Sequence, residues 1–165
     1  MLVYVLDDEV KISEVFHDLE ELAPEHHFKL FSDSKSLRDE VNRARAENYL
    51  DSEAIFIVDH DLRSYETGLQ FVRWLRESHE LGLLLPVVML TGRLSVTDYV
   101  RSQWADPFLH CDMILTKNDA QNPDFDWAEM LSGLSTRYAA MKQLIADQSM
   151  KRIECLSRLS KHVGD

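Results

Sequence analysis

The chain has 165 residues, which is enough for one domain of ordinary size with a segment to spare. Hydrophobic residues make up 45% and charged residues 28%, a composition typical of a folded globular protein rather than a disordered one. The net charge of −11 argues against a protein built mainly to bind nucleic-acid phosphates or an anionic membrane. No apolar run reaches the roughly 20 residues of a membrane span.

The beginning of the chain and its cysteines indicate the cellular compartment. The segment that starts at Met1 turns acidic at Asp7 and lacks the basic residues of a signal peptide. Two cysteines, Cys111 and Cys155, are too few for a disulfide framework and have no metal-ligand spacing. We therefore expect a cytoplasmic protein with reduced thiols.

Strand and helix patterns alternate along the chain. Short apolar runs predict buried strands at residues 2–6, 27–31, 54–58, 86–90 and 113–116. Amphipathic spacing predicts helices over residues 9–22, 32–47, from Gly68 onward and over 95–104, and a longer helix capped by Asp124 or Asp126. Strands that are apolar throughout and separated by helices are typical of a parallel sheet covered on both faces. The predicted fold is an α/β fold with a doubly wound five-stranded parallel sheet.

Polar side chains follow the predicted strands at the points where the strands end, and such strand ends form the binding edge of a parallel sheet. In chain order these side chains are Asp7, Asp8 and Glu9, then Asp59 and Asp61, then Thr91, and last Lys117. Clustered carboxylates repel one another without a cation, and oxygen ligands suit Mg²⁺ or Mn²⁺. A hydroxyl and an ammonium group opposite them suit an incoming phosphoryl group. One such aspartate alone would be read as a turn or helix cap, but the whole set predicts a carboxylate nucleophile with a metal.

The segments VYVLDDE, AIFIVDHDL, PVVMLTG and CDMILTK resemble the receiver domain of bacterial response regulators, and the resemblance covers about residues 2–140. It implies a flavodoxin-like sheet of strand order 2-1-3-4-5. It also implies a receiver core over residues 1–123, followed over 124–165 by a closing helix that extends into a helical tail.

The resemblance implies a role for each residue of the site. Asp59 would accept a phosphoryl group from a phosphohistidine, supplied by a sensor histidine kinase or a phosphotransfer protein. Asp8 and Asp59 would ligate Mg²⁺ directly, together with the main-chain carbonyl of Asp61, and Asp7 would act partly through water. Thr91 and Lys117 would bind the phosphoryl oxygens. The residues expected to tune dephosphorylation are His60, Asp61, Gly92 and Arg93, and Asp61 and Arg93 are either an ion pair at the mouth of the site or two solvated charges.

Three positions depart from the family pattern. Ile114 stands where the family has an aromatic switch residue, Asn118 follows the lysine in place of proline, and Arg63 stands where a proline is common. These changes leave the expected phosphorylation chemistry intact. They make the usual switching through an aromatic ring on the fifth strand doubtful.

The carboxyl-terminal segment is longer than one closing helix requires. Heptad steps run through Trp127, Leu131, Leu134, Tyr138, Met141 and Ile145, lapse at Gln148 and Ser149, and resume less clearly. Residues 127–140 are expected to close the sheet, and the rest to run beyond the domain, toward a partner helix or a second copy. The helix is expected to begin soon after Lys117 and to carry the signal outward. No DNA-recognition unit is present in the sequence, so direct DNA binding is not expected.

Two other functions fit part of this sequence. The Asp59-His60-Asp61 segment also fits a haloacid-dehalogenase-type phosphatase, but there the final acidic pair follows the lysine, whereas Asp7 and Asp8 precede Asp59. The second is a receiver-like interaction module that never turns over phosphate, and the position of Ile114 favours it. We expect a protein that is not an enzyme beyond its own phosphorylation and slow dephosphorylation. The sequence leaves open whether it is a stand-alone receiver or a piece of a longer regulator.

Overall fold

The computed structural model describes residues 1–9, 19, 21, 23–47, 54–62, 66–78, 84–92 and 94–162. The helix predicted over residues 9–22 lies mostly outside the described residues, although Leu19 and Glu21 within it are helical.

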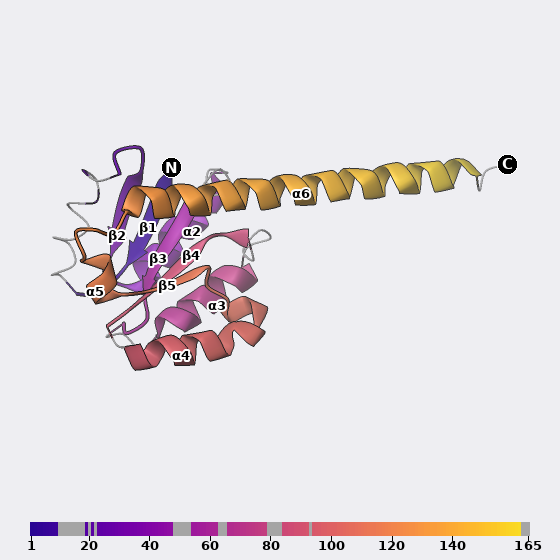
Figure 1. Cartoon of the computed structure of the whole chain (residues 1–165). Helices are drawn as coiled ribbons and strands as arrows, with labels where there is room; N and C mark the ends of the chain where they lie inside the picture. Colours follow the sequence, from indigo (N-terminus) through magenta and orange to yellow (C-terminus); the bar gives the residue numbers. More distant parts are fainter. Residues whose placement is uncertain are drawn as a thin grey trace.

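Five parallel strands form one sheet in the order β2-β1-β3-β4-β5 (Figure 1). The strands are β1 (Leu2–Leu6), β2 (His27–Phe31), β3 (Ala54–Asp59), β4 (Val87–Thr91) and β5 (Met113–Thr116). Each lies within one residue of its predicted range. The central strands β1, β3 and β4 are buried and have the continuous apolar runs of strands covered on both faces, whereas the edge strands β2 and β5 are more exposed. The predicted fold class and strand order are confirmed.

The helices follow the predicted alternation with small changes at their ends. They are α2 (Ser34–Ala46), α3 (Gly68–Ser78), α4 (Leu94–Ser102), α5 (Lys117–Ala120) and α6 (Trp127–His162), with 3-10 turns at Gln103–Ala105 and Pro107–Leu109. α2 begins at Ser34 because Oδ1 of Asp33 accepts a hydrogen bond from the Ser36 N–H at 2.8 Å, which caps the helix. The short helix α5 and the two 3-10 turns were not predicted.

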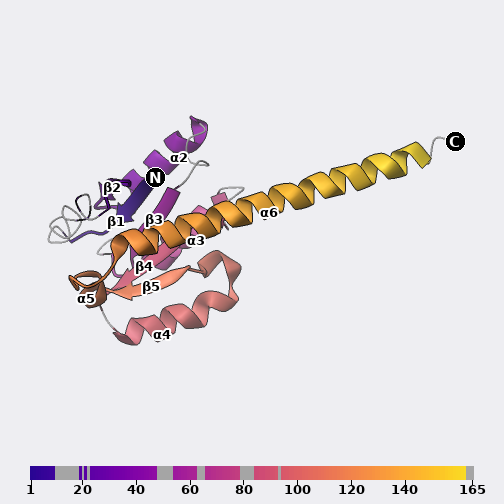
Figure 2. The same cartoon turned by 45° about the horizontal axis from the view of Figure 1, so that its top comes forward.

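The core has two layers because successive strand residues point to opposite faces of the sheet. On one face, Tyr4 and Phe56 pack with α2, α3 and α4, and their rings stack with centroids 5.0 Å apart. On the other face, Val3, Ile55 and neighbouring strand residues pack with α6. Figure 2 shows α6 crossing the sheet on the side opposite to α4. The sheet is thereby covered on both sides, and its strand ends stay open.

Helix α6 has 36 residues, and only its first third packs on the sheet. Leu134 and Tyr138 are buried, whereas Met141 and Ile145 are each 41% exposed. The first part of the helix therefore covers the sheet, and its exposed apolar strip begins at Met141 rather than at Leu134. The helix continues through Gln148 and Ser149, where the heptad pattern lapses. Among the described residues, no helix is both long and apolar enough to cross a membrane.

A buried arginine joins several elements at the opposite end of the sheet from the predicted site. Arg76 of α3 is 3% exposed, and its guanidinium donates to the main-chain oxygens of Leu85 and His110. One of its nitrogens also lies 3.8 Å from Oδ2 of Asp112, whose Oδ1 lies 3.6 Å from Nη1 of Arg137 on α6. Through Arg137 this network reaches α6 near the point where the helix leaves the sheet.

Candidate functional site

The parallel register brings the predicted site residues to one edge of the sheet. Leu6 pairs with Val58, so Asp7 and Asp59 follow neighbouring strand positions. Asp59 in turn pairs with Leu90, the residue before Thr91. The carboxyl ends of β1, β3 and β4 therefore deliver their polar residues to the same place, beside the start of α5.

Three carboxylates gather at this edge. One oxygen each from Asp7, Asp8 and Asp59 lies within 4.8 Å of the other two. Asp59 is 1% exposed, and its Oδ1 accepts a hydrogen bond from the Asp61 N–H at 3.2 Å. The Glu9 N–H donates to Oδ1 of Asp7 at 2.8 Å. Main-chain donors thus hold two of the three carboxylates in place.

Lys117 reaches into the cluster from the end of β5. Its Nζ donates to Oδ2 of Asp59 at 2.9 Å and lies 3.1 Å from Oδ2 of Asp7 and 3.6 Å from Oε2 of Glu9. Burial lowers the pKa of Lys117, but the hydrogen bonds and charges of Asp59 and Asp7 outweigh burial and raise it. The lysine is therefore a fixed ammonium group beside the predicted phosphoacceptor.

The site carries more negative charge than one lysine neutralises. Burial raises the pKa of Asp7 to about 6; the Glu9 N–H opposes this rise, and the charge of Asp59 adds to it. Carboxylate oxygens at this spacing are ligands that Mg²⁺ and Mn²⁺ prefer. Asp7, Asp8 and Asp59 therefore fit a divalent cation. The contribution of the Asp61 main-chain carbonyl stays a prediction.

An open pocket of about 350 Å³ leads to the cluster and is lined by Glu9, Asp59, Asp61, Gly92 and Lys117. Thr91 is fully buried at the end of β4, next to the pocket residue Gly92. The pocket gives an incoming group access to Asp59, which is otherwise covered. Thr91, Gly92 and Lys117 thus come together with the acidic cluster as the sequence predicts, while their chemical roles stay predictions.

Of the predicted tuning residues, Asp61 and Gly92 line the pocket, and His60 lies beside Asp61. Arg93 lies outside the described residues, and so does its predicted ion pair with Asp61. The Asp61 carboxylate, 48% exposed, lies 2.9 Å from Nδ1 of His60. The His60 ring also contacts Tyr99 of α4, a residue that the sequence analysis did not single out. Ile114 is half-buried on β5 and packs against the core cluster on the face of the sheet that carries α4.

Gly68 lies close to the backbone of Asp59, an approach that was not predicted. Its N–H donates to the main-chain oxygen of His60 at 3.1 Å. A Cβ at this position would lie well inside 3.0 Å of the main-chain oxygen of Asp59, closer than real Cβ atoms come. The first residue of α3 therefore presses on the backbone that carries Asp59. The signal in the sequence is a glycine where the loop after β3 becomes a helix.

The connection from β5 to the long helix differs from expectation. Oγ1 of Thr116 accepts a hydrogen bond from the Asp119 N–H at 3.0 Å, which caps the helical turn α5. Helix α6 begins ten residues after Lys117 rather than close behind it. Oδ1 of Asp126 accepts from the Glu129 N–H at 2.8 Å, so Asp126 caps α6, and not Asp124.

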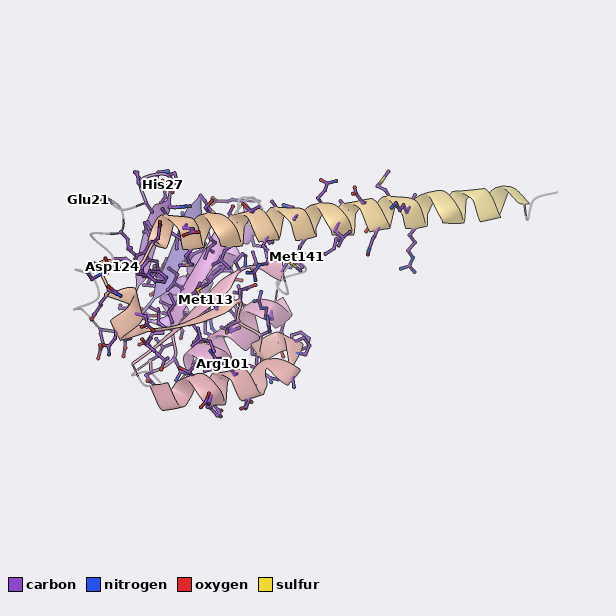
Figure 3. The ribbon with its side chains drawn as sticks, in the orientation of Figure 1. Glu21, His27, Arg101, Met113, Asp124 and Met141 are labelled. Atoms are coloured by element: carbon purple, nitrogen blue, oxygen red, sulfur yellow. The ribbon has the colours of Figure 1, made fainter. Side chains whose placement is uncertain are left out.

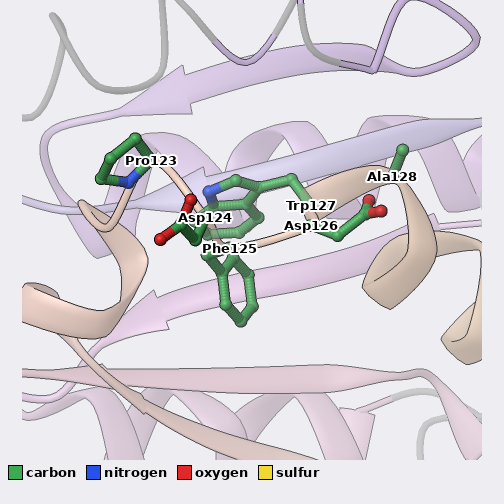
Figure 4. A pocket seen from close by; sticks show the side chains of 6 residues that line it. All are labelled: Pro123, Asp124, Phe125, Asp126, Trp127 and Ala128. Carbon is green, nitrogen blue, oxygen red and sulfur yellow. The ribbon is translucent and has the colours of Figure 1, made fainter.

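A second pocket, of about 300 Å³, lies at this connection and is lined by residues 123–128 (Figure 4). The Trp127 indole N–H donates to the main-chain oxygen of Ala120 at 3.2 Å, and its ring meets Phe125 edge to face, with centroids 5.1 Å apart. These contacts fasten the start of α6 to the end of α5. The pocket brings together no set of catalytic side chains.

The fold of the chain, but not its sequence, matches known proteins. No protein-family model matches the chain, and no curated protein matches it in sequence. A response regulator receiver domain protein from Clostridium thermocellum matches with a TM-score of 0.56 at 18% identity, over 87% of this chain and 98% of that one. The Mn(2+)-bound response regulator Rcp1 has a TM-score of 0.55 at 18% identity, over 81% and 90%. The bacteriophytochrome response regulator AtBRR has a TM-score of 0.61 at 17% identity, over 82% and 91%. The chain has the fold of the response-regulator receiver domain.

Proposed function

We propose that the chain is the phosphoacceptor of a two-component phosphorelay and that Asp59 takes a phosphoryl group from a histidine kinase or a phosphotransfer protein. The observation that carries this proposal is the position of Asp59. Its carboxylate is almost fully buried, hydrogen-bonded to Lys117, next to Asp7 and Asp8, and open to solvent through one pocket. Structural aspartates that only cap a turn do not need such surroundings.

The proposed step is a displacement at phosphorus. A carboxylate oxygen of Asp59 attacks, the new O–P bond forms, and the P–N bond to the donor histidine breaks, with its electron pair staying on the imidazole nitrogen. Charge on the phosphoryl oxygens is stabilised by the Lys117 ammonium group and the Thr91 hydroxyl. A bound divalent cation would supply further positive charge, held by Asp7, Asp8 and Asp59. The match to a Mn(2+)-bound receiver supports a metal of this class, and Mg²⁺ is our choice.

The test is phosphorylation with a small donor. Acetyl phosphate and Mg²⁺ should yield one modified site by mass spectrometry, and Asp59→Asn should remove it. Asp39→Asn, which changes an aspartate of α2 outside the site, is the matched control and should leave it unchanged. A product that survives Asp59→Asn would exclude the assignment.

The two other functions are distinguished by the same assay. A phosphatase of the haloacid-dehalogenase type would turn over many phosphate esters. The acid that follows Lys117 most closely is Asp119. Its hydrogen bonds with Thr116 cap α5, which does not favour a phosphatase. A receiver-like module without phosphate chemistry would give no product, and Ile114 in place of an aromatic residue is the feature that favours it.

The remaining parts of the proposal concern the setting. We propose a cytoplasmic protein that is not an enzyme beyond its own phosphorylation and slow dephosphorylation, that does not bind DNA directly, and that signals to a partner or to a second copy through the helix α6. Cys111 is a free buried thiol, and burial raises its pKa to about 12, which makes it unreactive.

A further inference from the structure

Where α6 leaves the sheet, it exposes an apolar face. Tyr138 is buried, but Met141, Leu144 and Ile145 are 41%, 57% and 41% exposed. Steps of three and four residues keep these three side chains on the face that packs against the sheet one turn earlier. Figure 3 labels Met141 at the point where the helix passes the end of the domain. We call Met141, Leu144 and Ile145 the tail strip.

Basic residues follow the tail strip along the same side of α6. Lys151 follows Leu144 by seven residues and Arg152 follows Ile145 by seven, so both lie on the same side of the helix, and both are exposed. Lys142 borders the strip at Ile145. Asp147 borders the strip at Leu144, and its carboxylate accepts a hydrogen bond from Nε2 of Gln143 at 2.8 Å. The face is therefore apolar from Met141 to Ile145 and basic at Lys151 and Arg152.

The charge distribution decides between possible occupants. Residues 141–165 hold five Lys/Arg and three Asp/Glu, whereas residues 1–140 hold 13 and 26. Two tail strips packed in parallel would bring Lys142, Lys151 and Arg152 close to the same groups of the other copy, which costs affinity. An anionic membrane or a nucleic acid would attract the tail but repel the acidic remainder of the chain. A protein surface with an apolar centre can carry its acidic groups at one end only, beside Lys151 and Arg152 and away from the acidic domain, so it avoids both disadvantages.

We propose that the tail strip binds an apolar groove with an acidic rim on a partner protein. The apolar side chains enter the groove, as amphipathic helices do in grooves of this kind, and Lys151 and Arg152 meet the acidic rim. The interaction belongs to the output of the proposed function but does not require phosphorylation. It can therefore be tested on the chain with Asp59→Asn.

The test uses two labelled synthetic amphipathic helices of about 20 residues with identical Leu/Ile faces. One has glutamates beside the apolar face, and the other has lysines. Fluorescence anisotropy with the full chain should show that the glutamate peptide binds at least about tenfold more tightly and that its binding weakens as salt rises. The double variant Met141→Ser, Ile145→Ser should lose about tenfold in affinity.

Two further variants serve as controls. Met150→Ser changes a residue that is 57% exposed but lies nine positions after Met141, on the opposite side of the helix, and should bind as the unchanged chain does. Lys151→Glu with Arg152→Glu should reverse the preference toward the lysine peptide. Circular dichroism checks that each variant keeps its helix.

Several results would overturn the proposal. Equal binding of both peptides, or binding of neither, excludes an acid-rimmed groove. Self-association in sedimentation that the variant Met141→Ser, Ile145→Ser abolishes would assign the tail strip to a second copy. Tighter binding to phosphatidylserine vesicles than to the glutamate peptide would assign it to a membrane. None of these results bears on the phosphorylation of Asp59, which has its own assay.

Discussion

The rings of His60 and Tyr99 meet edge to face, with centroids 6.1 Å apart and ring planes at 83°. His60 directly follows Asp59, and Tyr99 lies on α4 with 54% of its surface exposed. The Nδ1 atom of His60 lies 2.9 Å from Asp61, whose N–H donates to Asp59. A short series of contacts thus connects the predicted phosphoacceptor to α4 without involving Ile114 of β5.

Tyr99→Ala should weaken this connection while leaving the chemistry of the site unchanged. We expect the same yield of phosphorylated Asp59, but smaller amide shifts in α4 when beryllofluoride binds. The loss of stability should be below about 1 kcal/mol, because an aromatic pair this exposed contributes little. Arg101→Ala, at another exposed position of α4, is the control. Unchanged shifts in Tyr99→Ala would show that α4 receives no signal through His60.

Asp8→Ala should weaken Mg²⁺ binding more than Asp7→Ala does. Asp7 already faces the Lys117 ammonium group at 3.1 Å, and the predicted role of Asp7 is partly through water. We expect Asp8→Ala to abolish measurable binding and Asp7→Ala to weaken it by about tenfold, which is typical of a residue that supports a ligand. Titration of Mg²⁺ followed by amide shifts measures both. Equal affinities of Asp8→Ala and the unchanged chain would contradict the prediction.

Asp7 should make the metal-free protein less stable as the pH rises. Its pKa is raised from 3.8 to about 6 in the folded chain, mainly by burial. Below pH 3.8 the carboxyl group is protonated in both states, so it contributes no pH dependence. As the pH rises from there to about 6, the unfolded chain ionises first, the free energy of unfolding falls, and the full cost is present above pH 6.

Asp7→Asn removes this cost. With a chelator present, we expect the variant to be more stable than the unchanged chain at pH 7.5, by on the order of 2 kcal/mol. The difference should vanish toward pH 4 and shrink when Mg²⁺ is added, because the cation stabilises the ionised carboxylate. Urea unfolding at three pH values measures it. A variant less stable at pH 7.5 would show that the contact with Lys117 outweighs burial.

Gly68→Ala should displace the backbone of Asp59, the proposed phosphoacceptor. The added methyl group has no room beside the main-chain oxygen of Asp59, so α3 or the strand end must shift. We expect a loss of about 1–3 kcal/mol in unfolding free energy, as for other overpacked sites, together with weaker Mg²⁺ binding. At Gly133 of α6 a Cβ meets nothing within 4 Å, so Gly133→Ala should stabilise the chain by up to about 1 kcal/mol. Equal effects of the two substitutions would refute the close approach.

Arg76→Met should destabilise the fold far more than Arg73→Met on the same helix. Arg76 is buried and donates to two main-chain oxygens, which lose their partner in the variant. The side chain of Arg73 is 45% exposed, and it pairs with Asp106 at the surface. We expect a loss of about 3–5 kcal/mol for Arg76→Met and below about 1 kcal/mol for Arg73→Met. Thermal unfolding of both variants tests the difference, and a small effect at Arg76 would mean that water replaces its hydrogen bonds.

The acidic site could be predicted because it depends on two regular features. Continuous apolar runs identify strands buried on both faces, and parallel strands carry their carboxyl ends to one edge, so Asp7, Asp8 and Asp59 had to meet. The helical turn α5 also had a local signal, since Thr116 and Asp119 have the spacing of a capping pair, but a four-residue helix is too short to show periodicity.

Other features depend on contacts between distant segments, which leave little trace in one sequence. Arg76 lies seven residues after Leu69 on an apolar helix face, and nothing local indicates that its charge is satisfied by carbonyl groups from two other segments. The contact of Tyr99 with His60 depends on where α4 lies relative to the end of β3. The close approach of Gly68 to Asp59 depends on where α3 begins relative to β3. Each of these is a property of packing geometry rather than of local pattern.

The unequal division of α6 makes this helix a lever. Its first part packs on the sheet, where Arg137 pairs with Asp112. The 22 residues from Met141 to His162 extend beyond the sheet for about 33 Å, at 1.5 Å per residue. A tilt of about 10° where the helix leaves the sheet would carry the tip through about 6 Å, so a movement comparable to a side-chain rearrangement at the sheet becomes a displacement that a second molecule can read.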